Sequence, residues 1–387
     1  MKVALLSDCY LPRLGGIEVQ ERGLAYRLLE AGHEVEVFTA TLGENDERGG
    51  YVEIVDGLPI HRMGIRLPGR LPVNPLAARE TKRRLVAGRF DVAHVHMGIT
   101  SPFTVDATRA ALQVGLPVTM TWHCMLGPAE PLFHLSQIAR MWARSGVAMN
   151  AVSRVAARPV QRALGRIGPV EVLPNGIDAD VWWLGASVGE APEPPSRAGE
   201  LQVVSAMRLA TRKRPIPFLA VLRQVREAVP DVAFRVLILG EGRLESLVRS
   251  YVERHDMADW VHLPGRVSRP ELLQIYRHSH VYVSPAKLES FGIAALEARC
   301  MGLPVVALAS SGCVEFLDNG VNGFLARDDA GMAGAITNLL ADHALRERMF
   351  HHNVSSPPEQ DWTRVVDMTL QEYERAAALR GLTLQNS

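Results

Sequence analysis

The chain has 387 residues, of which 47% are hydrophobic. A chain of this length usually folds around more than one hydrophobic core, so we expect two domains. Lysine plus arginine and aspartate plus glutamate number 42 each, and the lack of a basic excess argues against nucleic acid as a partner. The four cysteines form no C-x-x-C pair and no Cys/His cluster of zinc spacing, which is typical of a reduced, cytoplasmic protein and indicates no metal site.

The first half of the chain alternates short apolar runs with helical patterns. Lys2–Ser7 is predicted as a strand and not a signal peptide, because the run is short and Pro12 follows it. A helix is expected over Ile17–Ala31. Further strands are expected at Glu34–Thr39, Asp91–His96, Pro117–Trp122, Val147–Val152 and Val170–Leu173, and a hairpin is expected within Val52–Ile60. This alternation favours an α/β fold with a parallel sheet covered by helices. No apolar run reaches the roughly 18 residues of a membrane span.

Residues 185–200, GASVGEAPEPPSRAGE, lack periodicity and are predicted as a linker. A second α/β series follows, with strands expected at Leu201–Ala206, Ala233–Leu239, Val261–Leu263, Val281–Ser284 and Pro304–Leu308. An amphipathic helix is predicted from Asp361 to about Leu379. We therefore expect a first domain over 1–184, on which the C-terminal segment 361–387 packs back, and a second domain over 201–356.

The most specific motif is the pair Glu289 and Glu297, eight residues apart, after the strand Val281–Ser284. Ser290 is predicted to cap the helix that follows, leaving backbone amides free for a diphosphate. On a helix the two carboxylates would lie about 12 Å apart, too far to share a proton. The alternative is that neither glutamate binds a ligand: Glu289 would only interact favourably with the helix dipole, and Glu297 would lie on a solvated helix face. The amides concerned are those of Phe291, Gly292 and Ile293.

Other candidate residues follow expected strands. Arg208 and Lys213 lie in a strand-to-helix loop and suit phosphate binding. Gly15–Gly16 lies in the corresponding loop of the first domain, where it could equally form a tight turn. His123 ends a strand, and a lone histidine is more often structural. Gly240-Glu241-Gly242 opens a helix and is predicted to shape a base or phosphate pocket.

A basic run extends from Arg62 to Arg89, with Glu80 as its only acidic residue. It suggests contact with anionic lipid or an anionic acceptor. The alternative, a solvated helix face, stays open. The basic residues are Arg62, Arg66, Arg70, Arg79, Lys82, Arg83, Arg84 and Arg89.

In their order along nearly the whole chain, these motifs resemble glycosyltransferase family 4, a retaining family with the GT-B fold of two Rossmann-like domains facing a central cleft. Pro174–Asp178 and Trp362 fit the resemblance as well. The resemblance implies that Glu289 binds hydroxyls of the donor sugar and Glu297 the ribose of the nucleotide. It implies that the leaving diphosphate is neutralised by Arg208 and Lys213.

The resemblance also implies that His123 contacts the donor sugar near the reacting carbon. Gly16 would line the phosphate or acceptor side. The remaining donor-binding residues are implied to be Gly15, Gly240, Glu241, Ser290, Phe291, Gly292 and Ile293. The chain departs from the family pattern at Arg214, where glycine is usual, and at Ser310–Glu315, where a Gly-Gly pair is usual, although Gly312 and Glu315 remain.

These residues imply a nucleotide-diphosphate sugar as substrate and no cofactor. The expected reaction moves a hexosyl unit, such as mannosyl, glucosyl or N-acetylglucosaminyl, with retention to a hydroxyl of a saccharide, lipid or small metabolite. Fixed cations stabilise the leaving group, so no metal is expected. No carboxylate is placed as a nucleophile, which favours front-face attack.

Three competing functions stay open. Another GT-B enzyme, such as a sugar-nucleotide epimerase or a phosphorylase, would use the same fold; a phosphorylase would need a lysine-bound cofactor. A non-catalytic nucleotide-sugar-binding protein would not need Arg208, Lys213 and both glutamates. A nicotinamide-dependent dehydrogenase is disfavoured by the missing G-x-G-x-x-G.

Overall fold

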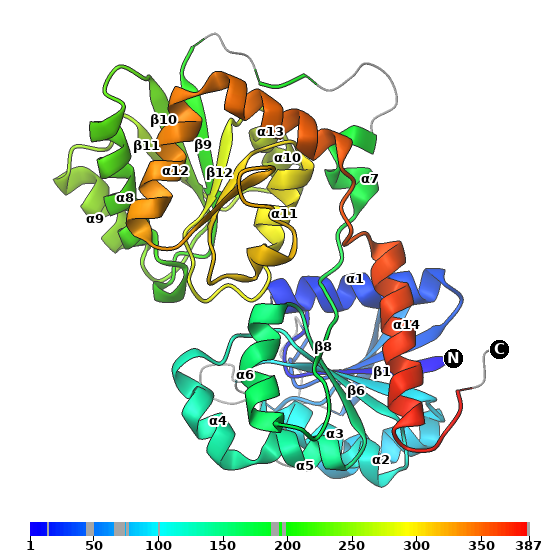
Figure 1. Ribbon diagram of the computed structural model, residues 1–387. Helices are drawn as coiled ribbons and strands as arrows, with labels where there is room; N and C mark the ends of the chain where they lie inside the picture. Colours follow the sequence, from blue (N-terminus) through cyan, green and yellow to red (C-terminus); the bar gives the residue numbers. More distant parts are fainter. Residues whose placement is uncertain are drawn as a thin grey trace. The chain divides into compact units, whose positions relative to one another are not determined.

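The computed structural model describes residues 1–13, 15–43, 50–65, 74, 77–99, 101–186, 193–195 and 199–384. It divides into two compact units, here called unit 1 (Met1–Gly176 with Trp362–Ser387) and unit 2 (Ile177–Asp361). Each unit is a sheet covered by helices (Figure 1). Residues 177–184, which the sequence analysis assigned to the first domain, group with unit 2. Of the expected linker, residues 187–192 and 196–198 lie outside the described part of the chain.

Unit 1 contains an eight-stranded sheet in the order β3-β4-β2-β1-β5-β6-β7-β8. All neighbouring strands are parallel except β3 and β4, which form an antiparallel hairpin. The strands are β1 (Lys2–Ser7), β2 (Glu34–Thr39), β3 (Tyr51–Val55), β4 (Leu58–Arg62), β5 (Val92–Met97), β6 (Val118–Trp122), β7 (Val147–Ala151) and β8 (Glu171–Val172).

Helices cover this sheet, and α14, from the C-terminal end of the chain, packs beside α1. The described α-helices of unit 1 are α1 (Gly16–Glu30), α2 (Ala77–Gly88), α3 (Pro102–Gln113), α4 (Glu130–Ser136), α5 (Ile138–Arg144), α6 (Arg154–Leu164) and α14 (Trp362–Ala378). Apolar residues of β1, β2 and β5 meet Leu24 and Leu28 of α1 and Tyr373 of α14 in one buried cluster. Burying one such aliphatic side chain contributes about 1.5–3 kcal/mol, which fixes the faces that these helices present to the sheet.

Unit 2 contains a six-stranded, fully parallel sheet in the order β11-β10-β9-β12-β13-β14. Its central strands β9 and β12 are almost entirely buried, as expected for strands covered on both faces. The strands are β9 (Leu201–Ala206), β10 (Phe234–Leu239), β11 (Val261–Gly265), β12 (Val281–Ser284), β13 (Val305–Leu308) and β14 (Gly323–Ala326).

The described α-helices of unit 2 are α7 (Ala179–Trp182), α8 (Pro215–Ala228), α9 (Glu245–Arg254), α10 (Arg269–Arg277), α11 (Ile293–Cys300), α12 (Asp329–Ala341) and α13 (His343–Ser355). Several start where the sequence supplies a capping side chain. Ser268 and Glu271 form a capping box on α10, and Asp328 accepts from the amide of Gly331 at the start of α12.

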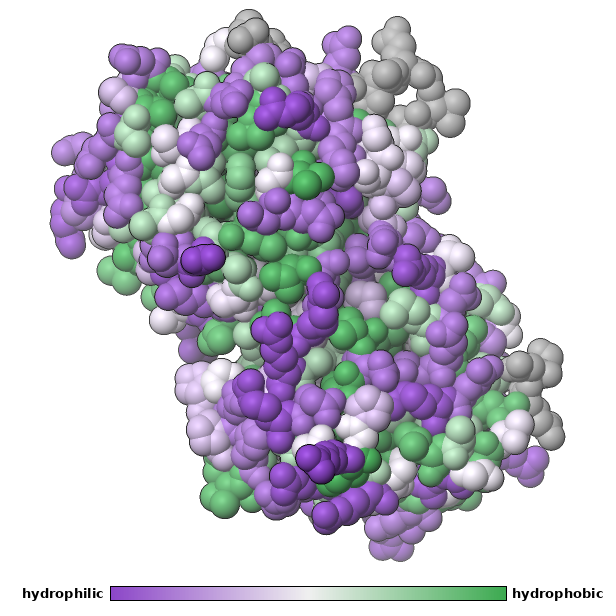
Figure 2. All heavy atoms as spheres, viewed as in Figure 1, coloured by the Kyte–Doolittle hydropathy of each residue, from purple (hydrophilic) through white to green (hydrophobic). Residues whose placement is uncertain are grey.

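Hydrophilic side chains make up much of the molecular face seen in Figure 2. Within the described ranges, no helix combines the length and the apolar character needed to cross a bilayer.

Candidate active site

Four loops of unit 2 follow the carboxyl ends of β9, β10, β12 and β13, where parallel sheets bind ligands. They comprise residues 207–214, 240–244, 285–292 and 309–315. Backbone hydrogen bonds join them in pairs. The amide of Leu209 donates to the carbonyl of Glu241 (2.9 Å), and the amide of Gly312 donates to the carbonyl of Glu289 (2.7 Å). The motifs that the sequence analysis singled out in this half of the chain therefore lie along one edge of one sheet.

Lys213 and Glu289 are brought together by this arrangement. The Lys213 ammonium donates a short hydrogen bond to Oε2 of Glu289, and the two side chains are only 19% and 16% exposed. Arg208 lies in the same loop as Lys213 and is exposed. An ammonium, a guanidinium and a carboxylate thus border the same strand ends. Such a set can neutralise phosphate oxygens and accept hydrogen bonds from a sugar.

The start of α11 differs from the sequence-based expectation. Gly292, not Ser290, is the residue before the helix; it has φ +94°, and no side chain caps the helix. Glu289 consequently lies outside the helix, so the predicted 12 Å helical spacing to Glu297 was wrong. Among the described residues, no hydrogen bond is made by the amides of residues 291–294. These donors are available to an anion, as the sequence analysis expected, although for a different local reason.

Two glycines allow the loop before α11 and the 309–315 segment to pack closely against each other. A Cβ on Gly312 would overlap the Ser290 carbonyl and would lie 2.6 Å from Cα of Phe291. A Cβ on Gly292 would lie 2.6 Å from Sγ of the buried Cys313. The 309–315 segment therefore supports the loop that carries Glu289 from behind.

Gly240 and Gly242 have a similar role for the Arg208 loop. A Cβ at either position would overlap a carbonyl, that of Met207 for Gly240 and that of Leu209 for Gly242. Gly240 also has φ +118°. The Gly240-Glu241-Gly242 motif, predicted to shape a pocket, is thus packed directly beneath the backbone next to Arg208.

Arg214, where the family pattern has glycine, adopts the left-handed conformation with φ +59°. Its guanidinium forms two hydrogen bonds to the carboxylate of Asp329 (2.6 and 2.9 Å) and one to the carbonyl of Pro285 (3.1 Å). Arg214 thus adopts a backbone conformation that favours glycine, and the hydrogen bonds of its guanidinium to Asp329 and Pro285 hold it there.

Glu297 lies on α11 and is half-buried. Burial raises the pKa of its carboxyl to about 8, an effect that the charge of Arg269 partly offsets. Its carboxyl group is therefore mostly protonated at neutral pH. In that state it can both donate to and accept from a hydroxyl pair such as that of a ribose.

In unit 1, Gly15 precedes α1 in an extended conformation and Gly16 is the first residue of that helix. Glu18, in the first turn, is buried and forms an ion pair with Arg13 (3.8 Å). His123 follows β6 and is 8% exposed; its Nε2 lies 2.9 Å from Nδ1 of His96 on β5. Burial lowers the pKa of His123 to about 4, so its imidazole is neutral at physiological pH.

His123 lines a pocket of ≈ 290 Å³ in unit 1 that the sequence analysis did not foresee. Its walls combine polar residues of β5 and β6 with the first turns of α14 and the 173–176 turn. Gln20 closes that turn by hydrogen bonds to both the amide and the carbonyl of Gly176 (2.9 and 3.0 Å). A Cβ at Gly176 would overlap the ring of Trp362, which explains why glycine stands in this turn.

The basic run is partly neutralised within unit 1. Arg62 is buried and bonded to Glu53 and the carbonyl of Leu11, and Arg83 and Arg84 both contact Glu80. Arg66 and Arg70 lie outside the described residues.

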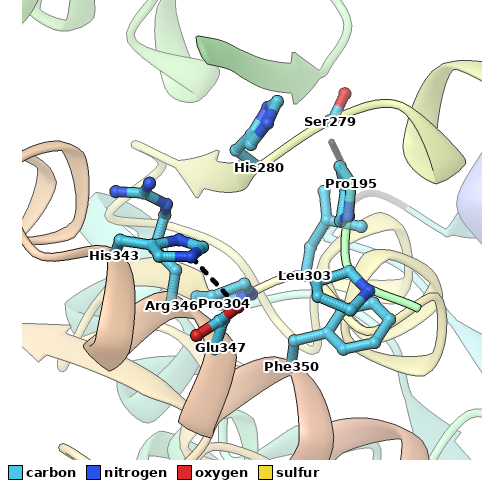
Figure 3. A pocket seen from close by; sticks show the side chains of 10 residues that line it. Pro195, Ser279, His280, Leu303, Pro304, His343, Arg346, Glu347 and Phe350 are labelled. Carbon is cyan, nitrogen blue, oxygen red and sulfur yellow. Dashed lines mark ion pairs between the residues drawn. The ribbon is translucent and has the colours of Figure 1, made fainter. Parts of the chain in front are cut away.

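A second pocket, of ≈ 350 Å³, lies in unit 2 (Figure 3). Residues at the amino ends of β12 and β13 line it, together with α13, on which His343 and Glu347 form an ion pair (3.0 Å). Since it opens at the strand ends opposite to the loops that carry Lys213 and Glu289, it is separate from the candidate site. Among the described residues, no cluster of three or more His, Cys, Asp or Glu side chains could hold a metal ion.

Two family models match successive parts of the chain. "Glycosyltransferase Family 4" matches residues 14–181 and "Glycosyl transferases group 1" matches residues 190–352. Among curated relatives, the chain is 28% identical to the D-inositol 3-phosphate glycosyltransferase of Pseudarthrobacter chlorophenolicus, covering 94% of this chain and 90% of that protein. It is 29% identical to the phosphatidyl-myo-inositol mannosyltransferase of Mycolicibacterium smegmatis, covering 100% and 97%.

Solved structures agree in fold. A glycosyltransferase from Rickettsia africae aligns with a TM-score of 0.72 at 15% identity, covering 100% of this chain and 99% of that chain. Anabaena Alr3699/HepE in complex with UDP-glucose aligns with a TM-score of 0.70 at 17% identity, covering 96% and 99%. The fold and the arrangement of loops define a glycosyltransferase of the GT-B class. The chain belongs to glycosyltransferase family 4. The central cleft and the roles of individual site residues stay predictions.

Proposed function

We propose that the protein is a retaining, metal-independent hexosyltransferase that uses an α-linked nucleotide-diphosphate sugar. The observation that carries this proposal is the Lys213–Glu289 pair beside the free amides at the start of α11. The α11 amides and Lys213 would bind the diphosphate, and Glu289 would bind the sugar. The two binding groups are adjacent, as a nucleotide-diphosphate sugar requires at its sugar–phosphate bond.

Each group has a distinct part in the proposed reaction. Lys213, Arg208 and the α11 amides stabilise the diphosphate as negative charge grows on it. Glu289 holds hydroxyls of the sugar, and Glu297 binds the ribose. The departing phosphate oxygen takes the proton of the acceptor hydroxyl, which attacks from the same face and so preserves the anomeric configuration.

The test is a screen of UDP-, GDP- and ADP-sugars for transfer and for slow donor hydrolysis, followed by NMR of the product anomer. We expect one donor to give an α-linked product, and we expect activity to survive EDTA because fixed cations replace a metal. A β-linked product from an α-linked donor would end the retaining assignment. Complete loss of activity with EDTA, restored by Mg²⁺ or Mn²⁺, would contradict metal independence. Epimerisation or phosphorolysis without an acceptor would favour another GT-B activity.

For the acceptor, we propose a hydroxyl of an inositol-containing molecule, because both relatives described above bear such an acceptor in their names. Inositol 3-phosphate and phosphatidyl-myo-inositol are the first acceptors to assay. Transfer to neither, with transfer to a simple saccharide instead, would exclude this class.

We also propose that α2 makes peripheral contact with anionic lipid at the cytoplasmic face of a membrane. Arg79, Lys82 and Arg83 are exposed on that helix together with Val86. The protein is expected to sediment with anionic liposomes and not with neutral ones, and less so at high salt, because exposed charges are screened beyond about 10 Å at 0.1 M. Sedimentation with both liposome types to the same extent would refute the contact.

A further inference from the structure

Three histidines of unit 1 are stacked next to one another: His94 and His96 on β5, and His123 directly after β6. The ring of His96 lies 4.3 Å from that of His94 and 5.1 Å from that of His123, with interplanar angles of 23° and 28°. All three are more than 90% buried. Burial lowers the pKa of each imidazole, to about 3 for His94 and well below its usual range for His96. The stack is therefore uncharged at neutral pH.

The protonation of His94 follows from its neighbours. Asn150 donates its amide hydrogens to the carboxylate of Glu372 (3.2 Å) and to Thr119 (2.9 Å), so its oxygen accepts from the hydroxyl of Thr121. Thr121 must then accept from Nε2 of His94 (2.7 Å). The neutral ring leaves Nδ1 as an acceptor for the Tyr373 hydroxyl (3.0 Å). His94 is thus fixed by groups from β6, β7 and α14 and provides a rigid surface for His96.

Within the described part of the chain, the ring of His96 has a single hydrogen bond, between its Nδ1 and Nε2 of His123 (2.9 Å). Its own Nε2 is buried and has no partner among those residues. Among backbone groups, a buried N–H is left without a partner less often than a buried carbonyl is, and we apply the same preference to the two ring nitrogens of His96. The proton of His96 therefore belongs on Nδ1, from which it is donated to His123. His123 then carries its own proton on Nδ1.

We propose that His96 is a positioning residue that holds His123 in one orientation and in the Nδ1–H tautomer. His123 consequently offers a hydrogen-bond donor to the donor sugar or its phosphate. This inference rests on the proposed function and on the contact between His123 and the donor sugar that the resemblance to glycosyltransferase family 4 implies. It assigns to the H-x-H pair of β5 a part in the reaction that the family motifs do not give it.

The effect on the reaction is geometric. If the neutral ring of His123 were free to rotate or to exchange tautomers, it would for part of the time present an unprotonated nitrogen to the donor sugar. In that state it could not donate the hydrogen bond. A fixed ring avoids this reorganisation at the moment of transfer. The histidine stack connects this fixed ring, through Tyr373, to α14.

The first measurement uses the unmodified protein and ¹⁵N-labelled histidine. The imidazole NMR spectrum should show His123 as a single tautomer with a protonated Nδ1 and a bare Nε2, and His96 also protonated at Nδ1. Averaged ¹⁵N shifts for His123, or a proton on its Nε2, would overturn the proposal. This measurement does not depend on any variant folding.

The second measurement compares two substitutions. His96→Phe keeps an aromatic ring in the stack but removes Nδ1, so kcat should fall on the order of 10–10²-fold, with averaged His123 shifts. His96→Asn places an amide nitrogen next to Cγ, where Nδ1 was, and should retain most of the activity and the His123 tautomer. The exposed His262 on β11 provides a matched control, since His262→Phe should change neither quantity.

Unchanged kcat and unchanged His123 shifts in His96→Phe would overturn the positioning role. Equal losses in the Phe and Asn variants would overturn it as well, because packing alone would then explain the effect. If the unmodified protein transfers no sugar to any acceptor, the proposed function fails. The histidine spectrum of the unmodified protein still decides the tautomer assignment in that case.

Discussion

Lys213→Ala is expected to lower kcat by about 10²–10³-fold while changing KM for the donor far less. The lysine ammonium lies in the largely buried pair with Glu289, beside the free α11 amides, where the charge of a leaving diphosphate would grow. An interaction that strengthens toward the transition state affects kcat more than substrate binding. The measurement is steady-state kinetics with the donor identified in the screen.

Glu297→Ala is the matched comparison for this experiment. A ribose contact is similar in the ground state and the transition state, so this change should mainly raise KM. Melting temperatures of both variants control for loss of fold. Near-normal kcat in Lys213→Ala would remove the lysine from the reaction and leave the fold assignment intact. A loss of kcat in Glu297→Ala as large as that in Lys213→Ala would refute the division of roles.

Gly312→Ala is expected to reduce kcat/KM by roughly 10²-fold, because a displacement of about 1 Å in a positioning loop can cost that much. The new methyl group would overlap the Ser290 carbonyl and press on Cα of Phe291, which are backbone atoms that cannot rotate away. The loop that carries Glu289 must therefore move. Overpacking of this kind also costs about 1–3 kcal/mol of stability, so the melting temperature should fall.

Gly334→Ala is the control for Gly312→Ala. Gly334 lies on α12 and is exposed, and a Cβ added there would have open space around it, with no neighbouring atom within 4 Å. Alanine at this position should stabilise the helix by about 0.5–1 kcal/mol and leave the kinetics unchanged. Unaltered kcat/KM in Gly312→Ala would show that the 309–315 segment does not support the Glu289 loop.

The alternation of elements could be predicted from sequence because strand and helix patterns are local. Apolar runs such as Leu201–Ala206 and Val281–Ser284 coincide with β9 and β12. The GT-B class and the family were also predictable, since the motifs stand in the right order at strand ends. Strand β14 and helix α13 were not predicted. The strand, GFLA, contains glycine and alanine, which are depleted in strands. The helix has no apolar face that stands out in its sequence, HALRERMFHHNVS.

The sequence by itself therefore determined the two α/β series, the loops that carry Arg208, Lys213 and Glu289, and the family. Only the tertiary structure decided how those loops are held. Serine is a residue type that often caps helices, yet Gly292 and not Ser290 is the N-cap residue of α11. Gly292 has a left-handed conformation and is packed on Cys313. Likewise, His96 reaches His123 only through the pairing of β5 with β6. Both outcomes depend on contacts between residues more than 20 positions apart, and local propensity contains no information about such contacts.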